Sequence, residues 1–573
     1  MKGGLEERGN RLLSNLTWSG FWAVMLAFGW LLPNHYLPWI AFHTDTWVAG
    51  MLTVAGFAIA FHSREPLEWT GLTVTATLVL LIPFAQYSGG LLLFSGQAWI
   101  TTIYLSGFSL SLMLGARWEK YQAGQALDAL FFAIALASVA SVGMQLCQWM
   151  GLSGDVAWIV YLTSNRPFAN LVQPNQLATF LLWGVIATGW FAHRGKIGAA
   201  TATFMAMFLL LGIALTQSRT SILAIIFCMA AGWYWRKLWY TKKRLQILVG
   251  LVIFFVICIL SIGPVSNAIF LDQRFNAVER IANGDIRLNA YKLFLDAIWQ
   301  RPFFGFGWTN LGPAQMLVAE NHVALGGVFQ HTHNIFLDLV LWTGLPIGVF
   351  LGCVLLRWFY LRFKSVIHVE EALLMLFVGV FWWHAMLELP HQYAYMLLPV
   401  GLVMGSIEVR TAAPVLFRTS RVFFTVLLVS TACLLGIVVR DYFRIEADFE
   451  ALRFERQYGM LPPQEIPETL VLSQLEAFIK MGRIKARSGT SQDELQWMRD
   501  TANTFPSPAN QLIYIESLAL NGHLEQAHQR MRLLQKVMGA SSYDGLGKIW
   551  FTKSEKNTLL AKTEWLPIVK SSK

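Results

Sequence analysis

Two histidines, His331 and His333, precede an apolar run that extends from Ile335 to about Arg357. Asn334 can cap a helix over this run, because its side-chain oxygen accepts hydrogen bonds from first-turn amides that have no other partner. His333 would then lie just outside the first turn. A neutral imidazole there can take a proton from a hydroxyl group, and the helix end beside it favours anions. The spacing therefore predicts a general base next to an anion site.

Asp338 lies a little over one helical turn into the same apolar run. Because an unpaired carboxylate is costly in an apolar environment, we expect Asp338 to pair with an arginine or to orient a histidine. A histidine that only caps a helix would be the simpler interpretation of His333. The second imidazole of His331 and the buried acid weaken that interpretation.

The composition is typical of a polytopic membrane protein. Of the 573 residues, 55% are hydrophobic and only 14% are charged, which is too apolar for a soluble chain of this length. We assign the net charge of +10 to cytoplasmic Lys and Arg anchors and to an anion site, and expect no nucleic-acid partner. The five cysteines show no metal-binding spacing, so none is expected to hold a metal.

Apolar runs and their basic flanks predict an all-α fold with about 13 membrane spans. Lys2, Arg8 and Arg11 place the N-terminus in the cytoplasm. The spans are expected at about 17–33, 42–61, 69–88, 97–115, 126–148, 176–192, 198–216, 221–235, 246–264, 335–356, 371–388, 394–409 and 422–439. The alternation of sides places four connections opposite the cytoplasm, which is the periplasm in a bacterium: about 149–175, 217–220, 265–334 and 389–393.

The last part of the chain has a different character. Residues 441–573 are polar and show helical periodicity at about 446–458, 467–482, 491–504, 508–521 and 523–538. The odd number of spans places this segment in the periplasm as well. We therefore expect a membrane domain over 1–440, with a long periplasmic loop at about 265–334, followed by a small α-helical domain of tetratricopeptide-like hairpins.

Three arginines lie in connections assigned to the periplasm, where the positive-inside bias does not explain them. Arg166 lies before the sixth span, Arg219 in a tight turn between two spans, and Arg287 in the long loop. Guanidinium groups suit a diphosphate, because each offers a planar fork of donors. The alternative for each arginine is an ordinary solvated or salt-bridged loop residue. That alternative fits Arg219 least, because its turn is so short.

Other polar residues gather near the same predicted face. His384 and Glu388 stand four residues apart at the end of one span, and His391 and Tyr393 follow. They would line the same cavity or form a structural polar pair, and we favour the cavity. Before the sixth span, the amides of Gln173 and Gln176 could hold sugar hydroxyls. Ordinary helix-start chemistry would explain the glutamines equally.

These segments resemble a known group of membrane enzymes. The order of Thr216-Gln217-Ser218-Arg219, Arg287, Arg301-Pro302-Phe303-Phe304-Gly305-Phe306-Gly307-Trp308, His331-Thr332-His333-Asn334 and Gly344-Leu345-Pro346 is similar to the O-antigen ligase/polymerase superfamily. Within it, the run from Arg166 to Gln176 and the run from Glu388 to Tyr393 resemble bacterial O-linked protein oligosaccharyltransferases of the PglL/PglS kind. The resemblance covers roughly residues 160–410, and the C-terminal segment 441–573, called the tail from here on, also fits this subgroup.

The resemblance implies an enzyme of the bacterial inner membrane whose active site faces the periplasm. Its donor would be a glycan on undecaprenyl diphosphate, and its acceptor a Ser or Thr of a periplasmic protein such as a pilin. Arg219 and Arg287 would clamp the diphosphate, and His333 would be the base. Gln176 and Tyr393 match positions tied to glycan transfer. The family needs no metal or other cofactor.

Two other functions remain open from the sequence. An O-antigen ligase would use the same chemistry on a lipid A-core acceptor; the tail and the Gln-Pro-Asn segment favour a protein acceptor, by resemblance only. A lipid-linked glycan transporter should place ionisable residues near the bilayer midplane, whereas here they gather near one face. Membrane lipids are expected partners in every case.

Overall fold

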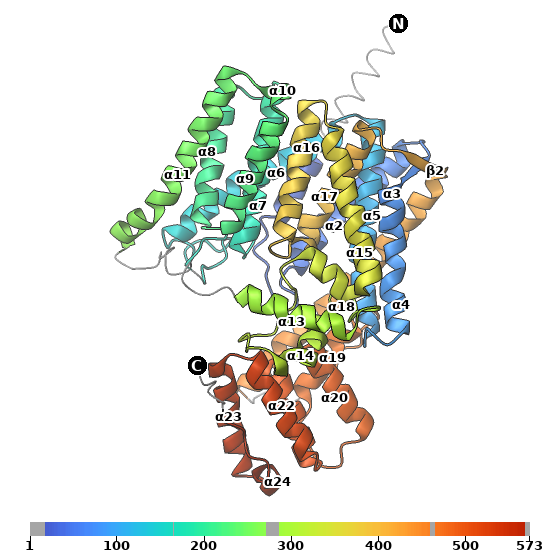
Figure 1. Cartoon of the computed structure of the whole chain (residues 1–573), viewed down its shortest axis with the longest axis vertical. Coiled ribbons are helices and arrows are strands. Elements are labelled where there is room, and N and C mark those ends of the chain that lie inside the picture. Colours follow the sequence, from blue (N-terminus) through green and yellow to red (C-terminus); the bar gives the residue numbers. More distant parts are fainter. Residues whose placement is uncertain (1–17, 164, 271–285, 459–464, 568–573) are drawn as a thin grey trace. The chain divides into compact units, whose positions relative to one another are not determined.

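The computed structural model describes residues 18–163, 165–270, 286–458 and 465–567. They form two compact units, shown together in Figure 1. The first unit contains the described residues of 1–78, 104–284 and 355–433, and the second contains those of 79–103, 285–354 and 434–573.

Almost all regular structure is helical. The first unit contains a helix over Trp18–Gly29, α2 (Phe42–His62), α3 (Gly71–Leu78), α6 (Gln125–Trp149), α7 (Pro174–His193), α8 (Ala199–Leu215), α9 (Arg219–Tyr234), α10 (Arg236–Trp239), α11 (Lys242–Phe270), α16 (Val369–Ala385), the 3-10 turn η3 (Pro390–Gln392) and α17 (Ala394–Arg410). The second contains η1 (Val79–Leu81), α4 (Ile82–Ser88), α13 (Ile286–Gln300), α14 (Leu311–Val318), η2 (Ala319–Asn321), α19 (Ser473–Arg483), α20 (Gln492–Thr504), α21 (Pro508–Leu520), α22 (Leu524–Val537), α23 (Ala540–Ser554) and α24 (Thr558–Ala561). Residues of α5 (Ser95–Tyr121), α15 (Ile335–Lys364) and α18 (Arg421–Tyr458) belong to both units.

Each interval expected to span the membrane contains helix. By length and composition alone, seven described helices could cross a bilayer, and one of them, α15, is broken, as described below. They are Phe42–His62, Gly71–Ser88, Ser95–Tyr121, Gln125–Trp149, Lys242–Ala268, Ile335–Lys364 and Arg421–Glu455. The chain is therefore a multi-pass, helical membrane protein, and the full count of about 13 spans stays a prediction.

Helix α7 is at the centre of the first unit, where it packs against α6, α8 and α16. Trp183 of α7 stacks on Phe377 of α16, with ring centroids 4.2 Å apart, and its indole N–H donates to the Phe377 carbonyl. Small residues allow the close approach: a β-carbon at Gly212 of α8 would lie 2.8 Å from Leu181. Such small residues let helices pack closely in a membrane, where hydrophobic association is weak.

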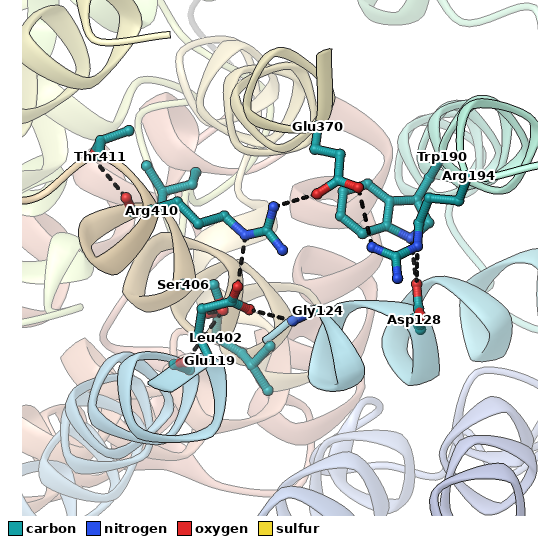
Figure 2. Close-up of polar contacts among 12 residues, drawn as sticks. Glu119, Gly124, Asp128, Trp190, Arg194, Glu370, Leu402, Ser406, Arg410 and Thr411 are labelled. Carbon is teal, nitrogen blue, oxygen red and sulfur yellow. Dashed lines mark hydrogen bonds and ion pairs between the residues drawn. The ribbon is translucent and has the colours of Figure 1, made fainter. Parts of the chain in front are cut away.

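One end of the first unit is held by a network of ion pairs, drawn in Figure 2. Glu370 accepts from both Arg194 and Arg410, Arg410 also pairs with Glu119 at 2.9 Å, and Arg194 lies 3.3 Å from Asp128. These five residues come from the ends of α5, α6, α7, α16 and α17. The predicted alternation of sides requires these ends to lie together, and they do.

Two features differ from the expected elements. Residues Leu67–Thr70 (β1) and Val415–Thr419 (β2) pair as an antiparallel two-stranded sheet, because both connections carry β-branched and aromatic residues. Helix α18 runs without interruption from Arg421 to Tyr458. The tail helix expected at 446–458 is therefore the continuation of the last expected span.

Helix α15 is broken, and here the prediction of one helix over 335–356 is wrong. Gly344 has φ +81° and ψ 168°, which is not helical. A β-carbon at Gly348 would lie 2.6 Å from the Cα of Val340, and one at Gly352 would lie 3.2 Å from the Phe336 ring. In a straight helix, residues sixteen apart would be separated by about 24 Å. The two parts of α15 therefore fold back and lie side by side.

The loop Arg301–Trp308 supplies partners to the backbone at this break. Leu345 N–H donates to the Pro302 carbonyl at 2.7 Å, and Phe306 N–H donates to the Leu341 carbonyl at 2.7 Å. Gln86 of α4 adds a side-chain bond to the Trp342 carbonyl at 2.7 Å. Irregular backbone at membrane depth is tolerated only where protein satisfies its polar groups, and this loop does so.

We expect Gly344→Ala to destabilise the protein strongly. Its backbone angles are essentially restricted to glycine, and a β-carbon would lie 2.2 Å from the Phe303 carbonyl oxygen; such strain alone costs about 1–3 kcal/mol. The apparent unfolding midpoint of the purified protein measures the effect. Gly250→Ala in α11 is the control, since nothing lies within 4 Å of that position, and it should not lower the midpoint. Equal midpoints for the two variants would contradict the assignment.

Arg483→Met should destabilise the tail. The Arg483 guanidinium binds Asp448 and Glu455 of α18 at 2.8–3.1 Å, and all three side chains are at most 11% exposed. Removing the arginine leaves two uncompensated carboxylates, which costs about 3–5 kcal/mol. Arg532→Met removes an exposed pair with Glu525 and should leave the unfolding midpoint unchanged. A similar midpoint for both variants would argue against the buried cluster.

Candidate functional site

The predicted site residues are divided between the two units, and each set is described by itself. The first unit carries Arg166, Gln173, Gln176, Arg219, His384, Glu388, His391 and Tyr393. The second unit carries Arg287, His331, His333 and Asp338. The predicted meeting of Arg219 with His333 stays a prediction.

In the first unit, Arg166 binds to two segments that were assigned to the same face. Its Nη2 donates to Asn175 Oδ1 at 2.9 Å, and its Nε donates to the Thr216 carbonyl at 2.7 Å. Asn175 Nδ2 in turn donates to Glu388 Oε1 at 3.1 Å. The expected connection 149–175 is therefore bonded directly to the ends of two expected spans, 198–216 and 371–388, at the face that the predicted alternation assigns to all three.

Arg219 begins α9 in the short turn after α8. The turn is tightly built: Ser218 caps α9 by accepting from Ser221 N–H, and Gln217 has a positive φ of 48°. The Thr216 carbonyl held by Arg166 lies at its start. The Arg219 side chain itself is exposed, and the backbone that carries it is fixed by the turn. It lies at the N-terminus of a helix, where anions are favoured.

His384 and Glu388 both contact α7. His384 Nδ1 lies 2.9 Å from Thr179 Oγ1, and Glu388 binds Asn175, one helical turn away on α7. The expected helix to 388 is too long, since α16 ends at Ala385 and Glu388 lies in the turn after it. The two side chains therefore connect α16 and its following turn to α7. His391 lies buried in η3.

The two glutamines differ in what they do. Gln173 is the N-cap of α7, where its side chain accepts from the N–H groups of Asn175 and Gln176; this is the helix-start role that was the alternative to sugar binding. Gln176 is 2% exposed and accepts from the Tyr395 hydroxyl. Tyr393, the N-cap residue of α17, packs against Tyr395 with ring centroids 5.4 Å apart.

Behind Gln176 lies a buried acid that sequence reasoning missed. Asp45 of α2 is 4% exposed, accepts from the Tyr104 hydroxyl at 2.5 Å and accepts from the Tyr395 backbone N–H at 3.0 Å. It therefore fixes the start of α17 beside Gln176. The signal was present in the sequence, because an acid inside an apolar run is as costly at 45 as at 338.

In the second unit, the segment His331–Asn334 has the predicted cap. Asn334 Oδ1 accepts from Phe336 N–H at 3.0 Å and from Leu337 N–H at 3.2 Å. The rings of His331 and His333 lie 4.2 Å apart, nearly perpendicular. His333 has a positive φ of 63°, a conformation that costs energy in a residue other than glycine and clusters at functional sites.

Asp338 binds the backbone of the segment His331–Asn334. It is fully buried, and its Oδ1 accepts from the Thr332 backbone N–H at 2.8 Å. The carboxylate therefore fixes the backbone between the two histidines. Because the first part of α15 folds back on the second, these histidines do not lie at the end of a continuous span, as was expected. Phe336, near the start of the first part, lies beside Gly352 of the second part. Gly352 is about 12 Å along the helix from the break at Gly344.

Arg287, which was expected in the long loop, lies within the first turn of α13. Its side chain is half-buried. In the described part of the chain, no group of three or more His, Cys, Asp or Glu side chains could hold a metal ion.

Comparison with known families places matches along these segments. Residues 204–352 match a family described as O-antigen ligase, residues 167–192 match one described as protein glycosylation ligase, and residues 372–544 match one described as virulence factor membrane-bound polymerase, C-terminal. The first match contains Arg219, Arg287, both histidines and Asp338.

Relatives with an assigned function point the same way. A general O-oligosaccharyltransferase of Acinetobacter baylyi is 28% identical over 538 residues, which are 90% of this chain and 91% of the relative. A ComP-specific O-oligosaccharyltransferase of the same organism is 28% identical over 250 residues, 43% of this chain and 44% of the relative. No solved structure matches the chain. The matches confirm the prediction of an oligosaccharyltransferase: the chain is similar to bacterial protein O-oligosaccharyltransferases of the O-antigen ligase superfamily.

Proposed function

We propose that this protein transfers a preassembled glycan from undecaprenyl diphosphate to a Ser or Thr hydroxyl of a periplasmic protein such as a pilin. It would act from the bacterial inner membrane with its site facing the periplasm. The observation that carries the proposal is the segment His331–Asn334: two imidazoles at the start of a capped helix, with the backbone between them held by a buried carboxylate. The similarity to O-oligosaccharyltransferases gives this base its reaction.

In the proposed step, the acceptor oxygen attacks the anomeric carbon of the first sugar. His333 takes the hydroxyl proton as the new C–O bond forms. The bond from the anomeric carbon to the diphosphate breaks, and undecaprenyl diphosphate leaves with its electron pair. Direct attack inverts the anomeric centre. His331 and Asp338 would keep the base in place.

Arg219 and Arg287 would bind the diphosphate and stabilise the charge that develops on it. Support for Arg219 comes from its rigid turn, which Arg166 holds through the Thr216 carbonyl. The glycan would lie beside Gln176 and Tyr393. It would also be bordered by residues near these two in sequence or contact, namely His384, Glu388 and His391. Gln173 has its side-chain oxygen engaged in the cap of α7, so its part would be structural.

A second candidate is ligation of O-antigen to lipid A-core, because the match over residues 204–352 is to a family described as O-antigen ligase. The tests below also separate both enzymes from a lipid-linked glycan transporter, which would move the donor without forming a new glycosidic bond.

His333→Ala should abolish glycan transfer. The purified full chain is given the lipid-linked glycan together with a pilin or with lipid A-core, and each acceptor is analysed by mass spectrometry. Removing the base should reduce the rate by about 10²–10⁴-fold. His193→Ala, an exposed histidine at the end of α7, is the control and should keep full activity. Transfer retained by His333→Ala would remove His333 from the mechanism, and a modified lipid A-core in place of a modified pilin would select the second candidate.

Arg219→Lys should weaken donor use. Lysine keeps the charge but loses the planar fork that binds two phosphate oxygens. We expect kcat/KM for the lipid-linked donor to fall about tenfold or more, while KM for the acceptor stays unchanged. Arg357→Lys, an exposed arginine in the second part of α15, is the matched control. Unchanged donor kinetics in Arg219→Lys would rule out a bidentate clamp at this position.

A further inference from the structure

The segment that leads into the histidines is held by one buried glutamine. Gln315 of α14 is fully buried. Its Nε2 donates to the Gly327 carbonyl at 2.9 Å, and its Oε1 accepts from the Phe329 N–H at 2.7 Å. Both halves of the amide are therefore used on the backbone of one short stretch. A buried amide with both partners made is strongly directional, since losing either partner leaves a polar group unsatisfied.

Phe329 carries this constraint to the imidazole. Its ring lies edge-on to the His333 ring, with centroids 6.1 Å apart and an interplanar angle of 79°. On its other side it meets Phe294 of α13, with centroids 6.2 Å apart. Edge-to-face contacts at these distances are favourable and orient both rings. The path from Gln315 to His333 passes through a single residue.

Helix α14 is itself fixed from behind by the tail. A β-carbon at Gly312 of α14 would lie 2.6 Å from the Asn503 carbonyl oxygen of α20. Lys536 of α22 donates through its ammonium to the His322 carbonyl, and its own carbonyl accepts from Leu325 N–H at 3.2 Å. His322 also pairs with Asp296 at 2.9 Å, and this bond lowers the pKa of the Asp296 carboxyl below its usual range. Residues 322–329 therefore rest between α14 and the tail.

The other side of the histidine segment is fixed in the same way. Gln86 is 6% exposed; its Nε2 donates to the Trp342 carbonyl, and its Oε1 accepts from the Trp308 N–H at 2.9 Å. One glutamine therefore binds the backbone before the histidines and a second binds it after them, just ahead of the break at Gly344.

We propose that Gln315 is a positioning residue for His333, which it places through Phe329. The inference rests on the proposed role of His333 as the base. Gln315 touches no reacting group; it sets where the imidazole stands, and a displacement of about 1 Å can cost a hundredfold in rate. It also gives the tail a part in the reaction, because α14 is held against α20.

Gln315→Met keeps the size and shape of the side chain but loses both bonds. With the purified full chain, a lipid-linked glycan and the acceptor, we expect kcat to fall about ten- to hundredfold while KM for the donor stays within twofold. Phe329→Leu should behave alike, and Phe329→Tyr, which keeps the ring, should retain kcat. Gln125→Met is the matched control: Gln125 accepts from the Trp118 indole at the end of α5, and its loss should leave kcat unchanged.

A second measurement does not depend on the reaction. Carbethoxylation of each histidine by diethyl pyrocarbonate is followed by peptide mass spectrometry. In Gln315→Met, the rate at His333 should change at least threefold relative to His523, while Gln125→Met leaves that ratio unchanged. If His333→Ala retains transfer, the proposed role of His333 as the base fails, and this ratio still decides the positioning. The proposal is overturned if Gln315→Met leaves both kcat and the His333 ratio as in the native protein, or if Gln125→Met lowers kcat equally.

Discussion

The structure depends on how the backbone polar groups at one break in a helix find hydrogen-bond partners. At Gly344 the backbone of α15 turns back, and the N–H and C=O groups freed by the turn would each cost several kcal/mol in hydrocarbon. The loop Arg301–Trp308 supplies partners to them through its own backbone, and Gln86 adds a side-chain bond. The glycines of the loop and of α15 serve this contact: a β-carbon at Gly305 would lie 2.4 Å from the Leu341 carbonyl oxygen. The loop Arg301–Trp308 therefore holds the break in α15 mainly through backbone hydrogen bonds.

The first unit shows a corresponding division of labour between its two ends. At one end, charges pair with charges: Glu370 lies between Arg194 and Arg410. At the other end, Arg166 spends its donors on an amide oxygen and a carbonyl, and Asp45 accepts from a hydroxyl and a backbone N–H. These hydrogen bonds hold both side chains in place.

Much of the helical architecture could be predicted from the sequence, because long apolar runs bounded by basic residues have few alternatives in a membrane. The cap at Asn334 could likewise be predicted from residue type. The break in α15 was not, since Gly344 and Pro346 also occur within intact membrane helices; only the contacting loop decides between the two. The short sheet was hidden for a similar reason, because β1 and β2 are separated by most of the chain.

The site was predictable in its chemistry but not in its connections. Residue types indicated a base, cations and amides. They left open whether Gln173 would bind a sugar or cap a helix, and they did not indicate that Asp338 would accept a hydrogen bond from the Thr332 backbone. Asp45 was readable by the same rule as Asp338 and was overlooked. Gln315 carries no signal of its own, because a glutamine becomes informative only when both of its amide atoms have found partners.

The fold-back of α15 also joins two positions that look independent in the chain. Phe336 and Gly352 share one volume, since a β-carbon at 352 would lie 3.2 Å from the phenyl ring. A larger residue at 352 therefore requires a smaller one at 336. In an alignment of related chains, the residues at positions 336 and 352 should vary together. Insertions or deletions between these two positions should be rarer than in either flanking segment.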